Sequence, residues 1–195
     1  MRVLLVYAHP LGDSLNAKIK SVVATGLNEA GHEVDLVDLY ADGFDPVLTE
    51  HERETYFEDH FERGDRAKDY AKRLMACDGL IFIFPAWSMG PPAILKGFFD
   101  RVFGPDVSFR LDPDGSLHAN LRHITKAAAF VTYGRERPIL WWFGDPPRRL
   151  IKRWLKWFLA PGAPVLFLGF YGLHKPSAAG TKRFLNKVSR AMAKF

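Results

Sequence analysis

Apolar residues along this chain follow two patterns, continuous runs and runs with helical spacing. The run at residues 2–8 is rich in Val and Leu and does not alternate with polar residues, which indicates a strand covered on both faces. The first helical run is capped by Asp13 or Ser14 and extends to about Ala30, with Gly31 as its stop signal. The predicted strands are residues 2–8, 33–39, 79–84, 127–133 and 164–171, and the other predicted helices are residues 66–76, 92–103, 147–159 and 178–193.

Strands and helices alternate along the chain, which predicts an α/β fold with a doubly wound parallel sheet and helices on both faces. For five strands the common order is 2-1-3-4-5, and ligands bind beyond the carboxyl ends of the strands where that order reverses. The loops at residues 9–16 and 85–91 are therefore the candidate site. The chain has no repeat, low-complexity tract or linker, so residues 1–195 are expected to form a single domain.

The composition narrows the classes of protein. With 48% hydrophobic and 25% charged residues, the chain is neither disordered, collagenous nor a disulfide scaffold. Cys77 is the only cysteine, so no intrachain disulfide can form and a cytoplasmic location is expected. Its place before a buried strand favours an inert structural thiol. No run approaches the roughly 20 apolar residues of a membrane span, and the N-terminus is read as a first strand rather than a secretion signal.

Positive charge is concentrated at the C-terminal end of the chain. Residues 1–140 carry 16 basic and 21 acidic side chains, whereas residues 141–195 carry 11 basic side chains and one acidic side chain, Asp145. Such an excess attracts nucleic acid, anionic lipid or an acidic ligand such as a dinucleotide, and charge alone does not choose among them. We expect no nucleic-acid partner. Membrane docking is disfavoured because the sheet needs the apolar stripe of the basic helix at residues 147–159.

The first candidate loop, HPLGDSLNA at residues 9–17, ends a buried strand and opens a helix. Its backbone amides, the Ser14 hydroxyl and the Asn16 amide could converge on a phosphate. The loop is neither GxGxxG nor GxxxxGK[ST], so it indicates neither a dinucleotide-type turn nor a nucleoside triphosphate loop. The alternative is that Ser14 only caps the helix and His9 is an ordinary loop residue.

The second candidate loop lies in FPAWSMGPPAILKGFFDRVF, residues 84–103. Its proline, tryptophan and methionine directly follow a buried strand and would form a rigid apolar shelf for a flat aromatic ligand. The alternative is that Trp87 and Met89 are core residues and that Gly90-Pro91-Pro92 is only a helix entry.

These segments carry a family resemblance. The motifs are His9-Pro10, Ser14 and Asn16, then Phe84-Pro85, Trp87, Met89-Gly90, Pro92, Lys96-Gly97 and Asp100-Arg101-Val102-Phe103, and finally Thr132-Tyr133-Gly134 after the fourth strand. In order and spacing the chain resembles the NAD(P)H:quinone oxidoreductases of the flavodoxin-like superfamily, and the matching segments cover nearly the whole chain.

The resemblance implies a flavin, either FAD or FMN, held by its phosphates at the first loop and by its ring at the other two. It also implies ping-pong hydride transfer, in which NAD(P)H reduces the flavin and leaves before a quinone takes its place and accepts two electrons. His9, as an extra phosphate partner, favours FAD slightly. The implied flavin-binding residues are His9, Ser14, Leu15, Asn16, Ala17, Pro85, Ala86, Trp87, Ser88, Met89, Thr132, Tyr133 and Gly134.

The chain departs from this family after Gly134. Family members carry a tyrosine and a histidine there that stabilise charge on the reduced flavin. This chain reads RERPILWWFGDPP, which contains neither residue. Tyr133 is the nearest phenol and Arg135 the nearest cation, so these two become the catalytic candidates. Azo compounds, nitroaromatics and free flavin stay open as acceptors. There are two alternative functions. One is an electron carrier, which the basic C-terminal region disfavours, and the other is a regulatory subunit of a membrane transporter.

Two further groups of residues bear on partners and metals. Trp141, Trp142 and Phe143 could line the substrate slot or face a second subunit, and the resemblance implies a homodimer; the alternative is that they belong to a helix core. His51 and His60 lie in an acidic segment that a solvated helix explains without an ion, so no metal site is expected.

Overall fold

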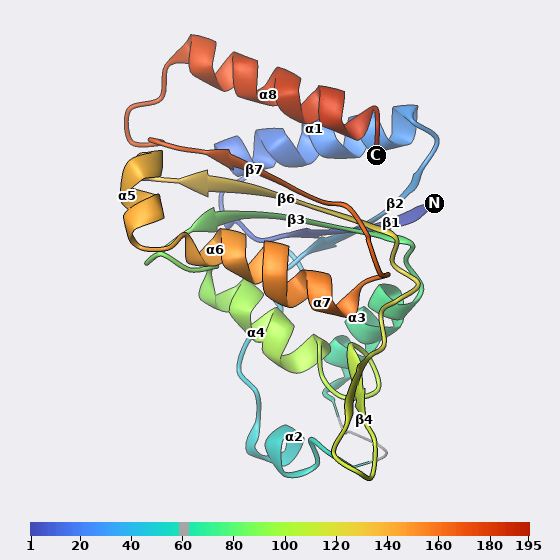
Figure 1. Ribbon diagram of the computed structural model, residues 1–195. Helices are drawn as coiled ribbons and strands as arrows, with labels where there is room; N and C mark the ends of the chain where they lie inside the picture. Colours follow the sequence, from blue (N-terminus) through green and yellow to red (C-terminus); the bar gives the residue numbers. More distant parts are fainter. Residues whose placement is uncertain (59–62) are drawn as a thin grey trace.

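The computed structural model describes residues 1–58 and 63–195 and has a parallel sheet between two layers of helices (Figure 1). The strands of this sheet are β1 (Arg2–Tyr7), β2 (Glu33–Asp38), β3 (Gly79–Ala86), β6 (Lys126–Tyr133) and β7 (Val165–Phe170). They are hydrogen-bonded in the order β2-β1-β3-β6-β7, and every pair is parallel. Counted within the sheet alone, this is the predicted α/β arrangement with its order 2-1-3-4-5.

The strand labels skip two numbers because β4 (Phe109–Leu111) and β5 (Leu117–Ala119) form a separate antiparallel hairpin, which the sequence analysis did not predict. These strands are short and mostly exposed, so no buried apolar run marks them. The turn between them closes through the Asp112 amide, which donates to the Ser116 carbonyl, and Gly115 has a φ of 84°.

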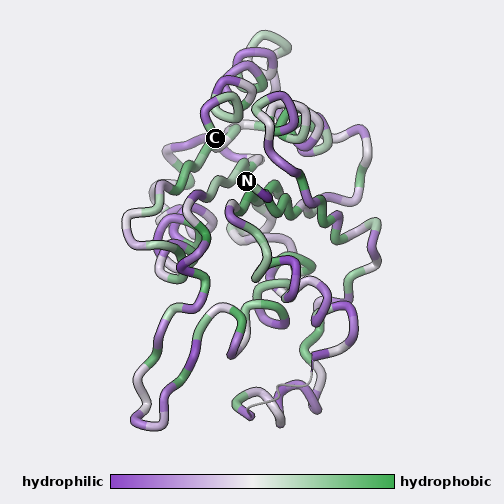
Figure 2. Tube along the Cα trace, turned by 90° about the vertical axis from the view of Figure 1, so that its right-hand side faces the viewer, coloured by the Kyte–Doolittle hydropathy of each residue, from purple (hydrophilic) through white to green (hydrophobic). Residues whose placement is uncertain are grey.

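The helices cover both faces of the sheet. In Figure 1, α1 (Leu15–Glu29) and α8 (Ala178–Met192) lie on one face, and α3 (Asp65–Met75) and α4 (Ala93–Val102) lie on the other with the basic helical segment. Figure 2 shows the most hydrophobic stretches in the central strands, with polar stretches in the outer helices. The remaining helices, α2 (Glu50–Glu54) and α5 (Arg137–Trp142), are short.

Side chains of each central strand enter both halves of the core. Leu4 and Val6 of β1 pack with the α3–α4 side, whereas Val3 and Leu5 pack with α1 and α8, and all four are buried. This two-sided burial explains why the strands appear as continuous apolar runs. Gly26 of α1 lies against Met192 of α8, where a Cβ would be 2.9 Å from the Met192 Cβ.

The basic helix predicted at residues 147–159 is helical but not regular. It consists of α6 (Pro146–Arg149), a π-helical stretch η1 (Leu150–Leu155) and α7 (Lys156–Phe158). Ile151 and Leu155 are buried against the sheet, as the amphipathic pattern predicts, while Trp154 and Trp157 stay 37% and 47% exposed. A π-turn interrupts a helix without ending it, and local apolar spacing does not reveal it.

A buried ion pair fastens α2 to α4. Glu52 and Arg101 are 2% and 8% exposed, and the Arg101 Nη2 lies 2.6 Å from the Glu52 Oε1. The backbone amides of Thr49 and Gly64 also donate to this carboxylate, at 2.8 and 3.0 Å. Burial raises the pKa of Glu52, but these hydrogen bonds outweigh it, chiefly the one from Arg101, and lower the pKa to about 2. Arg101 of the resemblance motif is thus a structural residue.

Three smaller findings concern redox, metals and membranes. The Cys77 thiol is buried and donates to the Leu74 carbonyl, and burial raises its pKa to about 12, as expected of an inert thiol. His51 lies on α2, and His60 lies outside the described residues. Within residues 1–58 and 63–195, every helix is too short or too polar to cross a bilayer.

Candidate functional site

The carboxyl ends of β1, β3 and β6 lie side by side and bring the three motif loops together. Tyr7 is in register with Ile83, and the Ala8 amide continues the ladder by donating to the Ile83 carbonyl at 3.0 Å. On the other side of β3, Pro85 and Ala86 are in register with Thr132 and Tyr133. The predicted meeting of the first two loops is therefore confirmed, and the third loop is their neighbour.

The first loop is organised by Ser14, which caps α1. Its hydroxyl accepts from the Ala17 amide at 3.1 Å and donates to the Leu11 carbonyl at 2.9 Å. Helix geometry leaves the Leu15 and Asn16 amides without intrahelical acceptors, so they are donors at the positive end of the helix dipole. The capping role considered for Ser14 is confirmed, and it coexists with donors suited to an anion.

His9 is a second donor at this end of the sheet. Its Nδ1 accepts from the Leu11 amide at 3.1 Å, and burial lowers the pKa of its imidazole, so the ring is neutral at neutral pH. In a neutral imidazole whose Nδ1 accepts, the proton is on Nε2. His9 therefore presents an N–H donor rather than a charge.

Asn16 joins the first loop to the third. Its Nδ2 donates to the Thr132 Oγ1 at 2.8 Å, and each residue is 1% exposed. The Asn16 Oδ1 is also buried, and within the part of the chain that the structure describes it has no hydrogen-bond partner. A buried, unpaired acceptor costs about 1–3 kcal/mol, so this atom is a position where a ligand donor would be stabilising.

The second loop contains a strained turn. Trp87 and Gly90 pair through two backbone hydrogen bonds of 3.0 and 2.9 Å, and Ser88 and Met89 between them have φ angles of 48° and 62°. These are the left-handed angles of a type I′ turn, which Asn and Gly adopt more readily than Ser or Met. Strain of this kind concentrates at functional sites.

This turn leaves Trp87 exposed beside His9. Trp87 is 43% exposed, and its ring lies 5.8 Å from the His9 ring, centroid to centroid. The core alternative for Trp87 is therefore wrong. Met89 is partly buried and packs against the core, so that alternative holds in part for Met89.

The third loop places its two catalytic candidates differently. Tyr133 is 1% exposed, donates its hydroxyl to the Asp145 Oδ1 at 2.7 Å and stacks on Tyr171 with ring centroids 4.8 Å apart. Burial raises the pKa of Tyr133, and Asp145 raises it further. Its phenol is thus engaged within the protein, whereas Arg135 and Gly134 are exposed.

The loop after β7 adds residues that the sequence analysis missed. The His174 Nδ1 is hydrogen-bonded to the Gly134 carbonyl, and the Leu173 amide donates to the Tyr133 carbonyl at 2.9 Å. Tyr171 and His174 thus join the third loop from the end of the sheet's last strand. The strand-end rule, applied to the fifth predicted strand as well as to the first, third and fourth, predicts residues at this position.

The model of a protein family described as having a flavodoxin-like fold matches residues 1–139 of this chain. The chain belongs to this family. YcaK of Escherichia coli, an uncharacterized NAD(P)H oxidoreductase, is 32% identical over 108 residues, which cover 55% of this chain and 55% of YcaK. The ribosyldihydronicotinamide dehydrogenase (quinone) of Pongo abelii is 32% identical over 148 residues, 68% of this chain and 63% of that protein. The crystal structure of Smu.1420 from Streptococcus mutans, 32% identical, matches 100% of both chains with a TM-score of 0.87.

These relatives include NAD(P)H and quinone oxidoreductases, so the resemblance inferred from the motifs is confirmed at the level of the family. The chain spans about half the length of the curated relatives it matches.

Proposed function

We propose that this flavodoxin-like protein is a flavin-dependent NAD(P)H oxidoreductase that reduces quinones or similar small acceptors by two electrons. The observation that carries the proposal is the convergence of three strand-end loops, joined by the Asn16–Thr132 hydrogen bond and the His9–Trp87 ring contact. One loop offers phosphate donors and a second exposes Trp87. Asn16 bonds to Thr132 of the third loop, and among the described residues its Oδ1 has no hydrogen-bond partner. The relatives named above support the reaction class.

The residues present fit a flavin. The free amides at the start of α1 and the Nε2–H of His9 suit its phosphates, and the buried Asn16 Oδ1 can accept from a ligand hydroxyl or N–H. We propose that residues 14–17 with His9 hold the phosphate end and that residues 85–89 and 132–134 hold the ring. His9 as an additional donor supports FAD over FMN.

A bound flavin would accept a hydride from NAD(P)H and pass two electrons to the acceptor. The protein supplies orientation and electrostatics. The type I′ turn fixes the amides of residues 87–90, and Trp87 offers a flat apolar face. We propose Arg135, the exposed cation after Gly134, as the group that stabilises negative charge at this edge. Because its hydroxyl is engaged with Asp145, Tyr133 contributes its backbone rather than a proton.

A loading experiment tests the proposal. Purified protein is incubated with FAD or FMN, desalted and examined by absorption, then mixed anaerobically with NADH or NADPH and finally with a quinone. We expect retained flavin, loss of its visible absorption on adding NAD(P)H, and recovery on adding quinone. Failure to retain either flavin would overturn the proposal, and retained flavin that NAD(P)H does not bleach would favour an electron carrier or a regulatory subunit.

Trp87→Ala should weaken flavin binding about tenfold or more, because base-sized rings stacked on an aromatic side chain gain roughly 1–3 kcal/mol. The melting temperature should change little, since Trp87 is 43% exposed. Flavin titration followed by fluorescence measures both the affinity and the quenching. Trp157→Ala, which removes a 47% exposed tryptophan on α7, is the control. Equal affinities in the two variants would remove Trp87 from the site.

We also propose a homodimer, supported by an exposed aromatic surface. Trp142 and Phe143 are 76% and 50% exposed, and their rings pack edge to face with centroids 4.8 Å apart. This exposure excludes the helix-core alternative for them in one subunit, and an exposed aromatic patch of this kind is typical of an interface. Trp142→Ser should shift the protein toward monomer in light scattering after gel filtration, whereas Trp157→Ser should not. An unchanged dimer, or a wild-type monomer, would contradict this interface.

A further inference from the structure

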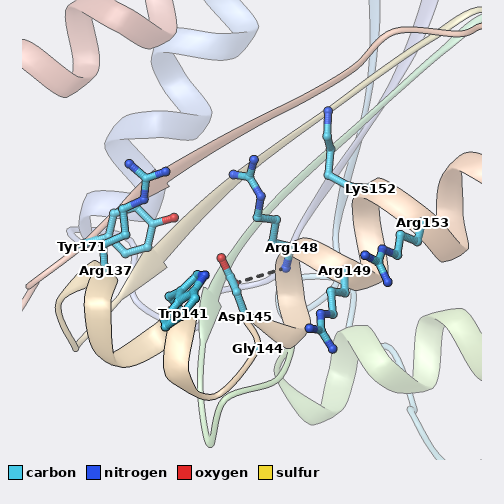
Figure 3. A pocket seen from close by; sticks show the side chains of 9 residues that line it. All are labelled: Arg137, Trp141, Gly144, Asp145, Arg148, Arg149, Lys152, Arg153 and Tyr171. Carbon is cyan, nitrogen blue, oxygen red and sulfur yellow. Dashed lines mark hydrogen bonds between the residues drawn. The ribbon is translucent and has the colours of Figure 1, made fainter.

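A basic pocket of about 390 Å³ opens between α5, the α6–η1 segment and the end of β7 (Figure 3). Its volume is within the roughly 300–1,000 Å³ of small-molecule sites. The sequence left the C-terminal excess of positive charge without a function, and four of the eleven basic side chains at residues 141–195 line this pocket. Its lining residues with ionisable or aromatic side chains are Arg137, Trp141, Asp145, Arg148, Arg149, Lys152, Arg153 and Tyr171.

The cations of this pocket are not neutralised by carboxylates. Within the described ranges, the four arginines and Lys152 have no acidic side chain within 4.0 Å; Lys152 donates instead to the Val165 carbonyl at 2.6 Å. Asp145, the one acid of the pocket, accepts from the Tyr133 hydroxyl and the Arg148 amide. Five positive charges line this pocket against the single negative charge of Asp145, so an anionic ligand would be favoured.

The cations occupy two positions in the pocket. Figure 3 shows Arg148 and Lys152 extending toward β7, with Arg137 beside Tyr171, while Arg149 and Arg153 lie on the other side of the helical segment. Burial and Asp145 raise the pKa of the Tyr171 hydroxyl, and Arg137 and Arg148 oppose them, which is consistent with guanidinium groups close to that hydroxyl. Arginine forks bind phosphates with two hydrogen bonds each, so the arrangement suits two separate phosphate groups.

Aromatic side chains accompany these cations. Trp141 is 79% exposed at the end of α5, and the half-buried Tyr171 is stacked on Tyr133. A tryptophan face beside phosphate-binding arginines is suited to a nucleobase. The backbone around the pocket is held in a fixed and unusual shape, since Gly144 and Asp145 both have left-handed φ angles, 78° and 45°, and η1 is π-helical.

We infer that this pocket binds the adenosine bisphosphate half of NADPH, so that the protein prefers NADPH to NADH. The inference rests on the proposed function and on position. Tyr171 lines the pocket and stacks on Tyr133, whose neighbours Thr132 and Gly134 belong to the candidate flavin site. A dinucleotide anchored here by its phosphates can therefore extend its nicotinamide toward the loops proposed to hold the flavin ring, which would be the hydride acceptor.

Isothermal calorimetry with 2′,5′-ADP tests this without flavin or turnover, so its outcome is independent of the proposed function. We expect 2′,5′-ADP to bind at least about tenfold more tightly than 5′-AMP, because a charge-assisted pair contributes roughly 1.5–3 kcal/mol. The double variants R137Q/R148Q and R149Q/R153Q should each lose at least about tenfold in affinity. R183Q/K187Q, which removes two exposed charges from α8, should change it less than about twofold.

Trp141→Ala distinguishes the contribution of the base from that of the phosphates. It should weaken the binding of 2′,5′-ADP and leave the affinity for inorganic pyrophosphate unchanged. Melting temperatures confirm that each variant is folded. Equal binding of 2′,5′-ADP and 5′-AMP would overturn the inference, as would equal losses in the pocket and control variants. So would pocket variants that lose sedimentation with phosphatidylglycerol vesicles but keep nucleotide affinity, because the anion would then be a membrane surface.

Discussion

Replacing Arg101 with methionine is expected to destabilise the protein by about 3–5 kcal/mol, the usual loss when one partner of a buried ion pair is removed. Glu52 would keep its charge at 2% exposure while losing Arg101, whose Nε and Nη2 both donate to it. Arg101 also donates to the Asp45 carbonyl at 2.6 Å, so a backbone acceptor would lose its partner as well. Urea denaturation at neutral pH measures the free energy of unfolding.

Arg110→Met is the matched control, because its ion pair with Asp112 is exposed and should contribute at most about 1 kcal/mol. Acid offers a second readout. The folded pKa of Glu52, about 2, is below its ordinary value of 4.5, so its contribution to stability is present above the ordinary pKa and is lost as pH falls toward 2. Equal urea midpoints for the wild type and Arg101→Met would show that the Glu52–Arg101 pair does not hold α2 against α4.

Gly97→Ala is expected to destabilise the fold by about 3 kcal/mol, near the upper end for overpacking. A Cβ at Gly97 would lie 2.2 Å from the Pro46 carbonyl oxygen and 2.4 Å from the Pro46 Cα, so backbone must move to admit it. Alanine favours a helix by about 1 kcal/mol over glycine, which offsets only part of this cost. Thermal and urea unfolding measure the change.

Gly12→Ala is the control for this substitution, because a Cβ there meets nothing within 4 Å and the backbone does not have a positive φ. Its unfolding free energy should change by less than about 1 kcal/mol. If Gly97→Ala were as stable as the wild type, Pro46 would not be packed on α4 as the structure shows it.

Both predictions concern residues of the motif that first suggested the family. Gly97 allows the Pro46 backbone to pack against α4, and Arg101 binds Glu52 of α2, the helix that follows Pro46. Neither is among the residues proposed to hold a ligand. A family motif therefore combines two kinds of residue, those at the strand ends that form a site and those further along the helix that fasten a distant segment.

The sequence by itself determined the sheet and the location of the candidate site. Apolar runs identified four of the five strands, because a strand covered on both faces has no polar side, whereas the edge strand β2 carries Glu33, Asp35 and Asp38. The alternation of strands with helices indicated the strand order. That order placed the ends of β1 and β3 together, which the Ala8–Ile83 hydrogen bond confirms. Ser14 was also recognisable as a helix cap from the local pattern.

Only the tertiary structure decided how side chains pair across long separations. Asn16 meets Thr132 over 116 residues, the Tyr133 phenol is engaged with Asp145, and Tyr171 and His174 join the third loop from another strand. The basic pocket likewise depends on how α5 is followed by a turn, by α6 and then by the π-helical η1. Periodicity records which face of an element is buried, because burial follows local spacing. Partners across the fold depend on register and loop geometry, which that spacing does not contain.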